Sequence, residues 1–307
     1  MKVGCLLLIF GSLLFACSSG SERPASNMAA AREAKKERKE LRDAIKKIEP
    51  FFKPMGEPAE YDWLASHNEP GQTFAEYLDA DPTVPTGERQ TIYVLPLGRF
   101  DPKQKQIIET VTRYLEVFYD LPVRQLDPKT IRKDLDSKDT RFNDYLRTRQ
   151  VRTGFIIDTI LRPMLPADAA ALVALTDDDL FPDESMSFVF GQASLDGRVG
   201  VWSLRRLQLL ADRATFLRRT IKIAAHETGH MFSLRHCTKY ECVMSGSNHM
   251  NETDRRPLDA CPECTAKICW LSDVGQARRY ARLAEFCQNN GLAKEAEEFK
   301  RKAAAVQ

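Results

Sequence analysis

The sequence predicts an α+β fold, with a mixed twisted sheet, one long helix that carries the chemistry and a helical segment at the C-terminus. Three observations support this class. Two short apolar runs, 90–98 and 171–175, have the composition of buried strands. Paired runs on either side of Asp196-Gly197 indicate a β-hairpin. The stretch 211–232 indicates one long helix, and two further helical stretches follow near the C-terminus.

The predicted elements follow one another along the chain. After the strand 90–98, Asp101-Pro102 supplies a helix cap and a proline at the first turn. We expect a second helix over 143–161 and a second strand over 171–175. The hairpin comprises 187–194 and 198–203, and the long helix covers 211–232. Helices over 270–287 and 292–305 follow, separated by Asn289-Asn290-Gly291.

Three consecutive aspartates, Asp177 to Asp179, follow the second strand. They lack the alternating spacing, the glycine and the terminal glutamate of a calcium loop. We therefore expect a solvated turn or a helix cap at this point.

Composition and charge fit an ordinary globular protein. The chain has 307 residues, with 45 Lys and Arg against 43 Asp and Glu, and a formal net charge of +2. This balance gives no electrostatic reason to expect nucleic acid as a partner, and we expect none. We expect a monomer.

The N-terminus has the pattern of an export signal. Residues 3–16 carry no charge, and this run is too short for a stable membrane span but fits the core of a signal peptide. It ends in Leu-Phe-Ala-Cys, which resembles a bacterial lipoprotein box with Phe15 in place of a smaller residue. We expect cleavage before Cys17 and a lipid on that cysteine, which makes an exported lipoprotein anchored to the membrane of a bacterial cell envelope. Ordinary secretion and an uncleaved anchor are the alternatives.

We divide the chain into five parts. Residues 1–16 form the signal peptide, and 17–50 form a lipid-anchor tether with a charged helix. Residues 51–88 form an N-terminal accessory segment that begins among several prolines. Residues 89–270 form the main domain, and 271–307 form a C-terminal helical hairpin.

The stretch 226–236 carries the clearest chemical signal. His226 and His230 stand four residues apart, so on a helix their imidazoles share one face and can bind one metal ion, with Glu227 beside them as a general base. The helix must end near Ser233, after which His236 can turn back as a third ligand. Three nitrogens leave the fourth tetrahedral position open for water, which is typical of a catalytic zinc.

Two cysteine pairs follow this stretch. Cys237, Cys242, Cys261 and Cys264 have the spacing of a four-cysteine zinc site, and a pair of disulfides is the alternative in an exported chain. Met244 stands where a methionine-containing turn can form the floor under the metal. The two remaining cysteines, Cys269 and Cys287, we expect to be buried thiols, and one disulfide is the alternative.

The run HETGHMFSLRHC, followed by TKYE, CVM and CPEC, resembles the signature of the archaemetzincins, a branch of the metzincin metallopeptidases. The resemblance extends upstream through SFVFGQA and WSLRRL to IYVLPLG and covers roughly residues 60–264. It implies a metzincin-like metallopeptidase domain over 89–270, with a Met-turn at Met244. It also implies that the hairpin 187–203 supplies the edge strand with which an extended peptide pairs.

The same resemblance implies two zinc ions per chain. His226, His230 and His236 would hold the catalytic zinc, and the cysteines from Cys237 to Cys264 would hold a second, structural one. This chain departs from the family at Ser233, where the family has glycine. A left-handed backbone at a serine costs about 1 kcal/mol.

Two functional hypotheses follow. The first is a zinc-dependent peptidase, in which a zinc-bound water attacks the peptide bond while Glu227 accepts its proton and returns it to the leaving amine. The second is a catalytically weak or silent lipoprotein, stabilised by zinc, that binds peptides or cell-wall fragments, with a geometry relaxed by Ser233. Glu227 favours the first, because metal binding and folding have no evident need for a carboxylate there.

Overall fold

The computed structural model describes residues 39–131 and 135–307. The predicted signal peptide, the lipid attachment at Cys17 and most of the tether lie outside these described residues. Residues 41–307 form one compact unit, and only this unit is considered below. Within the described ranges, no helix combines the length and the apolar character needed to cross a membrane.

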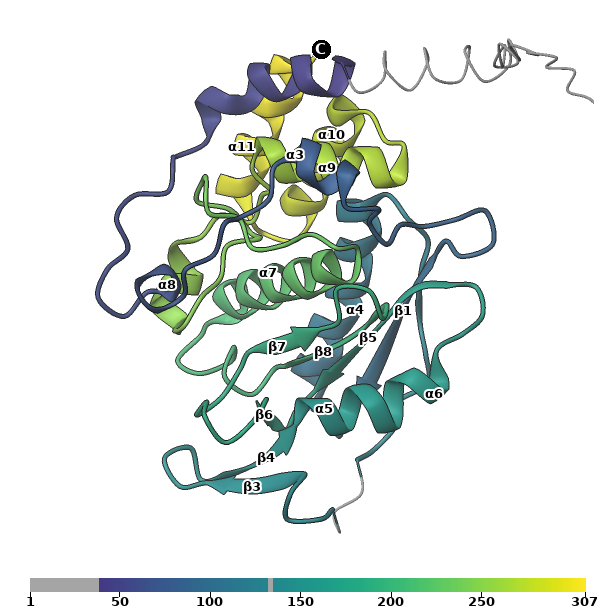
Figure 1. The fold of residues 1–307 in the computed structure, drawn as a ribbon, viewed down its shortest axis with the longest axis vertical. Helices are drawn as coiled ribbons and strands as arrows, with labels where there is room; N and C mark the ends of the chain where they lie inside the picture. The colour runs from purple at the N-terminus through teal and green to yellow at the C-terminus, as the bar shows by residue number, and fades with distance from the viewer. Residues whose placement is uncertain (1–38, 132–134) are drawn as a thin grey trace, which may run out of the picture. The chain divides into compact units, whose positions relative to one another are not determined.

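A five-stranded mixed sheet forms the centre of this unit (Figure 1). Four neighbouring strands run parallel, and the edge strand β7 runs antiparallel to its neighbour β8. The predicted α+β class, both predicted strands and the hairpin are confirmed, although β7 is shorter than expected. In order across the sheet the strands are β2 (Val123–Gln125), β1 (Thr91–Leu97), β5 (Ala169–Thr176), β8 (Val199–Ser203) and β7 (Gly191–Ala193).

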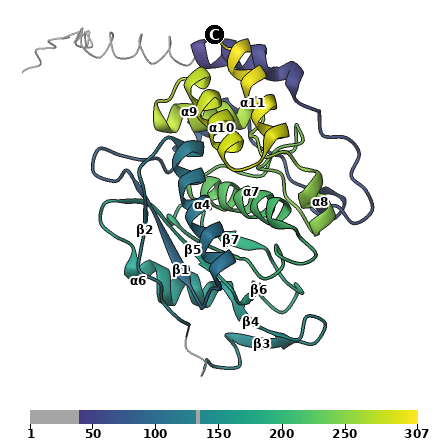
Figure 2. The ribbon, with the colours of Figure 1, turned by 180° about the vertical axis from the view of Figure 1, so that it is seen from behind.

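Helices cover both faces of the sheet. Successive side chains of a strand point to opposite faces, and both faces of the central strands are buried. Ile92 and Val94 pack in the core under α4 (Pro102–Tyr119) and α7 (Arg213–Met231). Tyr93 and Leu95 pack in a second core on the other face, under the continuous helical segment 153–164 (Figure 2). That segment consists of α5 (Thr153–Phe155), the π-helix η2 (Ile156–Leu161) and α6 (Arg162–Met164).

The helix predicted over 143–161 is wrong in its first half. A hairpin of β3 (Thr140–Asn143) and β4 (Thr148–Arg152) occupies that part, and β4 pairs in parallel with β6 (Asp179–Phe181). The side chain of Gln150 donates to Asp179 at 2.8 Å. The partner strand β6 lies about 30 residues further along the chain, so pairing with a distant strand outweighs the local helical propensity of these residues.

The expectation of a solvated turn or a helix cap at the three aspartates is wrong for Asp179, which begins strand β6. Asp179 is completely buried, and its carboxylate accepts two hydrogen bonds from Arg206 at 2.8 and 2.9 Å. Asp178 forms an ion pair with Arg149 at 2.6 Å. Arginine partners from other elements therefore hold these acids in the structure.

The C-terminal part contains three helices instead of the predicted two: α9 (Pro262–Ser272), α10 (Gln276–Asn289) and α11 (Ala293–Ala305). Asp273 takes a left-handed conformation, with φ of 52°, and ends α9 inside the predicted helix 270–287. Cys269 and Cys287 are buried free thiols, as expected. The remaining short elements are η1 (Glu49–Phe51), α2 (Trp63–Ser66), α3 (Phe74–Asp79) and α8 (Met250–Arg255).

Candidate active site

Helix α7 carries the first two predicted ligands, and the turn that follows it reverses the direction of the chain. Asp212 caps its start, since its carboxylate accepts from Thr215 N at 2.7 Å. At its end Ser233 takes the left-handed conformation, with φ of 62°, and Leu234 N donates to Gly229 O at 3.0 Å. The reversal returns the chain along the helix and brings His236 to the same place as the histidines of α7.

The three predicted histidines converge at one point. One ring nitrogen from each of His226, His230 and His236 lies within 4.8 Å of the others. The Nε2 atoms of His226 and His230 lie 2.9 Å apart. Two nitrogen lone pairs repel at this distance unless a cation or a proton lies between them.

Each of these rings is oriented by a hydrogen bond at Nδ1. Because the partners are oxygens that only accept, each Nδ1 carries a proton, and Nε2 is the nitrogen that faces the inner side. This tautomer is the one that binds a metal through Nε2. The pairs are His226 with Val243 O at 2.9 Å, His230 with Leu234 O at 2.7 Å, and His236 with the Glu69 carboxylate at 2.9 and 3.0 Å.

The electrostatics of the cluster keep two of these rings neutral. Burial, followed by the influence of the other two histidines, lowers the pKa of His226 well below its usual range. Burial and the neighbouring His236 lower the pKa of His230 to about 3. Neutral imidazoles with converging lone pairs are the donor set that zinc prefers, so the residues fit a zinc ion.

Glu227 lies next to this cluster, on the wall of a cavity of about 230 Å³. Its carboxyl group is buried, and burial alone raises its pKa to about 8, whereas a zinc ion on the histidines would favour the ionised carboxylate. A Cβ added to Gly191 would lie 2.6 Å from Glu227 Oε1, so the backbone of strand β7 passes close to the carboxylate. The histidines, the carboxylate and the edge strand therefore line one cavity.

Met244 lies under the histidine helix. Its side chain is completely buried and packs against Gly229, where an added Cβ would lie 2.6 Å from the thioether sulfur. Its carbonyl accepts from Cys237 N at 2.8 Å. The glycine between the two histidines of α7 thus leaves the space that the methionine fills.

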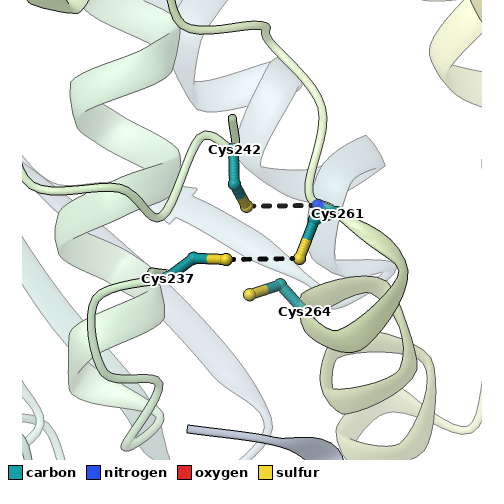
Figure 3. A group of neighbouring side chains, drawn as sticks. All are labelled: Cys237, Cys242, Cys261 and Cys264. Carbon is teal, nitrogen blue, oxygen red and sulfur yellow. Dashed lines mark hydrogen bonds between the residues drawn. The ribbon is translucent and has the colours of Figure 1, made fainter. Parts of the chain in front are cut away.

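The four predicted cysteines also come together (Figure 3). Their sulfur atoms all lie within 4.8 Å of one another, and the sulfurs of Cys237 and Cys261 are 3.5 Å apart. All four side chains are buried, and none forms a disulfide, so the disulfide alternative is not what the structure adopts. Two backbone N–H groups, of Met244 and Cys261, donate to Cys242 Sγ at 3.4 and 3.1 Å. Backbone donors stabilise a thiolate, so this set fits a four-cysteine zinc site.

A third group of possible metal ligands does not fit a metal ion. Asp62, His249 and Glu252 also bring ligand atoms within 4.8 Å. However, Arg255 forms an ion pair with Asp62, and Arg256 donates to Glu252 at 2.9 Å. Two guanidinium groups already neutralise the two carboxylates, so we interpret this group as an ion-pair network.

Ser233 is held by its own side chain. Its hydroxyl donates to Leu195 O at 2.8 Å and accepts from Thr83 N at 3.0 Å. Leu195 lies in the turn between β7 and β8, so the hydroxyl links the end of α7 to the hairpin that borders the cavity. Two hydrogen bonds that glycine cannot make offset the cost of the left-handed backbone.

We expect the two smallest substitutions at Ser233 to separate these effects. Ser233→Gly loses both hydrogen bonds but relieves the backbone, for a net loss of about 1 kcal/mol, whereas Ser233→Ala keeps the strain and loses about 2 kcal/mol. Urea denaturation of the wild type and the two variants measures the order of their free energies of unfolding. A glycine variant more stable than the wild type would show that the two hydrogen bonds contribute less than the backbone strain costs.

Glu69 is a residue of the site that sequence reasoning missed. It lies in the accessory segment, 167 residues before the histidine that it orients. Burial by itself would raise the pKa of Glu69, but the hydrogen bond from His236 keeps that pKa below the usual range of a glutamate. The accessory segment thus completes the site, and Trp63 from the same segment packs edge-on against His236.

Glu69→Ala is expected to weaken zinc binding about 10–100-fold, because His236 loses the group that fixes its tautomer and orientation. Competition with a chelator of known affinity measures the change. Glu60→Ala, at an exposed glutamate of the same segment, is the matched control and should bind zinc like the wild type. Equal affinities in the two variants would contradict the role of Glu69.

Comparisons with known proteins agree with this geometry. The model of peptidase family M54 matches residues 149–269. Archaemetzincin-2 of Mus musculus is 31% identical over 295 residues, which cover 83% of this chain and 81% of the mouse protein. The archaemetzincin of Archaeoglobus fulgidus is 40% identical over 110 residues, which cover 36% of this chain and 66% of that protein. The crystal structure of an archaemetzincin from Methanopyrus kandleri superposes with a TM-score of 0.50 at 27% identity, covering 62% of this chain and 99% of that one.

Proposed function

Since this chain belongs to the archaemetzincins, zinc-dependent peptidases of family M54, we propose that His226, His230 and His236 hold its catalytic zinc and that Glu227 is its general base. One observation carries this assignment. One ring nitrogen from each of the three histidines converges at the wall of a cavity that Glu227 also lines.

A zinc ion held by these nitrogens would polarise water and the substrate carbonyl and would stabilise the negative charge that develops on the carbonyl oxygen. Glu227 accepts a proton from the attacking water, whose oxygen bonds to the carbonyl carbon. As the carbon–nitrogen bond breaks, Glu227 returns the proton to the leaving amine. Val243 O, Leu234 O and Glu69 hold the three rings in place through their Nδ1–H groups.

Strand β7 is the proposed site of substrate pairing. It is the edge of the sheet, and Gly191, Gln192 and Ala193 line the cavity. An extended peptide can add to this edge as a further strand, held by main-chain hydrogen bonds that make little demand on its sequence. Gly191, which leaves room for the Glu227 carboxylate, places the paired peptide next to the general base.

We also propose a second, structural zinc on Cys237, Cys242, Cys261 and Cys264. The support is the group of four buried sulfurs, all free, with two backbone N–H groups directed at one of them. Such a site would fix the segment that contains Met244 and would anchor the start of α9 to it.

We propose that the protein is an exported, monomeric lipoprotein attached to a bacterial membrane through Cys17. The support is the uncharged run 3–16 and the cysteine that follows it. Labelling of full-length protein in bacteria with a fatty-acid analogue tests this. Label incorporation that persists in Cys17→Ala, or no incorporation at all, would overturn the lipid attachment.

A peptide library tests the peptidase function of residues 18–307. The products formed by the wild type are read by mass spectrometry and compared with those of Glu227→Ala, which exposes any contaminating protease. Products that require Glu227 support a peptidase, and their ends show whether it cuts internally or trims termini. If both proteins carry zinc and are equally inert, the alternative of a zinc-stabilised peptide-binding lipoprotein takes precedence.

A further inference from the structure

Lys222 lies at one end of the active-site cavity. It stands one helical turn before His226 on α7, so the two side chains project from the same face of the helix. Lys222 lines the cavity together with the histidines, yet only 7% of its surface is exposed. A buried ammonium group next to a catalytic centre is uncommon unless it has a partner.

The partners of Lys222 are two uncharged carbonyls. Its Nζ donates to Thr253 O and Asp254 O, both at 3.0 Å. The carboxylate of Asp254 itself is bound to Arg219 at 2.6 and 2.8 Å. In the part of the chain that the structure describes, the third N–H of Lys222 has no partner and no carboxylate contacts the ammonium group. Burial lowers the pKa of Lys222 to about 8, which leaves most of it protonated at neutral pH.

The rest of this cavity wall, as far as the structure describes it, supplies no counterion to Lys222, whereas Asp254 and Glu295, which line a second cavity that Lys222 also borders, act on it without contact. Arg256 also lines the cavity, but Glu252 accepts from it at 2.9 Å and neutralises it. Among the described residues of the wall, the one carboxylate is that of Glu227. The Lys222 end of the cavity is therefore a place where a buried anion would gain a charged partner.

The orientation of β7 indicates which part of a substrate reaches that end. The strand begins at Gly191, beside Glu227, and ends at Ala193, which shares a wall with His230 and His236. It therefore runs along α7 in the direction from Lys222 to His230. A peptide paired antiparallel to β7 runs the other way, so its residues after the scissile bond point toward Lys222.

We propose that Lys222 makes this cleft select a carboxylate on the residue that follows the scissile bond, either the side chain of aspartate or glutamate or the free carboxylate of a terminal residue. This inference rests on the proposed peptidase function and names its substrate class. Lys222 determines specificity and takes no part in bond breaking. Its third N–H is the donor for the substrate carboxylate.

The test uses fluorogenic peptides that differ only at the residue after the scissile bond, as Asp/Asn and Glu/Gln pairs, each with a free and an amidated C-terminus. Wild type should cleave the acidic member of a pair about tenfold or more faster in kcat/KM, as expected for one charged hydrogen bond. Lys222→Met should bring this ratio close to one, and Lys222→Arg should retain most of it. If faster cleavage depends on the free C-terminus instead of the acidic side chain, the terminal carboxylate is the group that Lys222 binds.

Lys267→Met is the matched control. Lys267 is also a buried lysine whose Nζ donates to a backbone carbonyl, that of Gln72 at 2.5 Å, but it does not line the cavity. The Lys267→Met variant should keep the wild-type ratio of kcat/KM between the acidic and neutral peptides. A wild type that cleaves both members of each pair equally, or a ratio that Lys222→Met leaves intact, would overturn the assignment.

A binding measurement separates this inference from the peptidase function. Fluorescence anisotropy of the same labelled peptides on zinc-loaded Glu227→Gln should show about tenfold tighter binding of the acidic members. If no peptide is hydrolysed but this preference is present and requires Lys222, the peptidase function fails and the carboxylate site stands. Equal binding of acidic and neutral peptides contradicts the carboxylate site whatever the hydrolysis shows.

Discussion

Glu227→Gln is expected to lower kcat for peptide hydrolysis about 10²–10⁴-fold, the usual contribution of a positioned general base. The amide has the size of the carboxylate but cannot accept the proton of the attacking water. Because Glu227 makes none of the hydrogen bonds that orient the three histidines, the variant should keep its zinc. Steady-state kinetics on one fluorogenic peptide, with zinc content measured by atomic emission on the same samples, give both results.

The two readouts together decide the role of Glu227. Loss of zinc along with activity would make Glu227 part of metal binding, and unchanged turnover with full zinc would show that another group accepts the proton. Purifying both proteins identically guards against a contaminating protease, since a contaminant would give the same rate in each.

The second large effect is expected at the cysteine site. Cys264→Ser should remove one of the two expected zinc ions, because a tetrahedral site loses one of its four thiolates. The metal contributes to folding directly, so we expect the free energy of unfolding to fall by more than about 3 kcal/mol and the unfolding midpoint by about 10 °C. Calorimetry and zinc analysis measure the two changes.

Cys269→Ser is the matched control for this variant. Cys269 lies on the same helix, α9, and is also a buried free thiol, but it is not part of the four-cysteine group. It should keep both ions and lose only the small packing contribution of a sulfur atom. Equal zinc content and equal stability in the two serine variants would rule out a metal at Cys264.

Several elements were predictable because their causes lie close together in the sequence. The start of α4 follows from Asp101, whose carboxylate accepts from Gln104 N at 2.8 Å only three residues away. The approach of His226 and His230 follows from the pitch of one helix, and the left-handed residue at Ser233 follows from the need to bring His236 back. In each case the geometry depends on a few neighbouring backbone angles.

The two wrong helix predictions have the opposite origin. The residues of β4 have no strong local preference for a strand, and they form one because β3 and β6 pair with them on either side. Asp273 ends α9 early, at a residue type that commonly takes the left-handed conformation but leaves a weak sequence signal. The ion pairs of Asp178 and Asp179 have no local sequence signal, because their arginine partners lie 29 and 27 residues away.

The sequence predicts the ligand types, their spacing and Glu227 as the base, because zinc chemistry requires certain atoms and one helix supplies three of the four residues. What surrounds these residues depends on tertiary packing. Glu69 reaches His236 across 167 residues, and Lys222 lies buried against two carbonyls at the end of α8, where the Asp254 carboxylate is bound to Arg219. Local backbone geometry is encoded in neighbouring residues, whereas the orientation and charge of a site depend on distant segments that meet only when the core is packed.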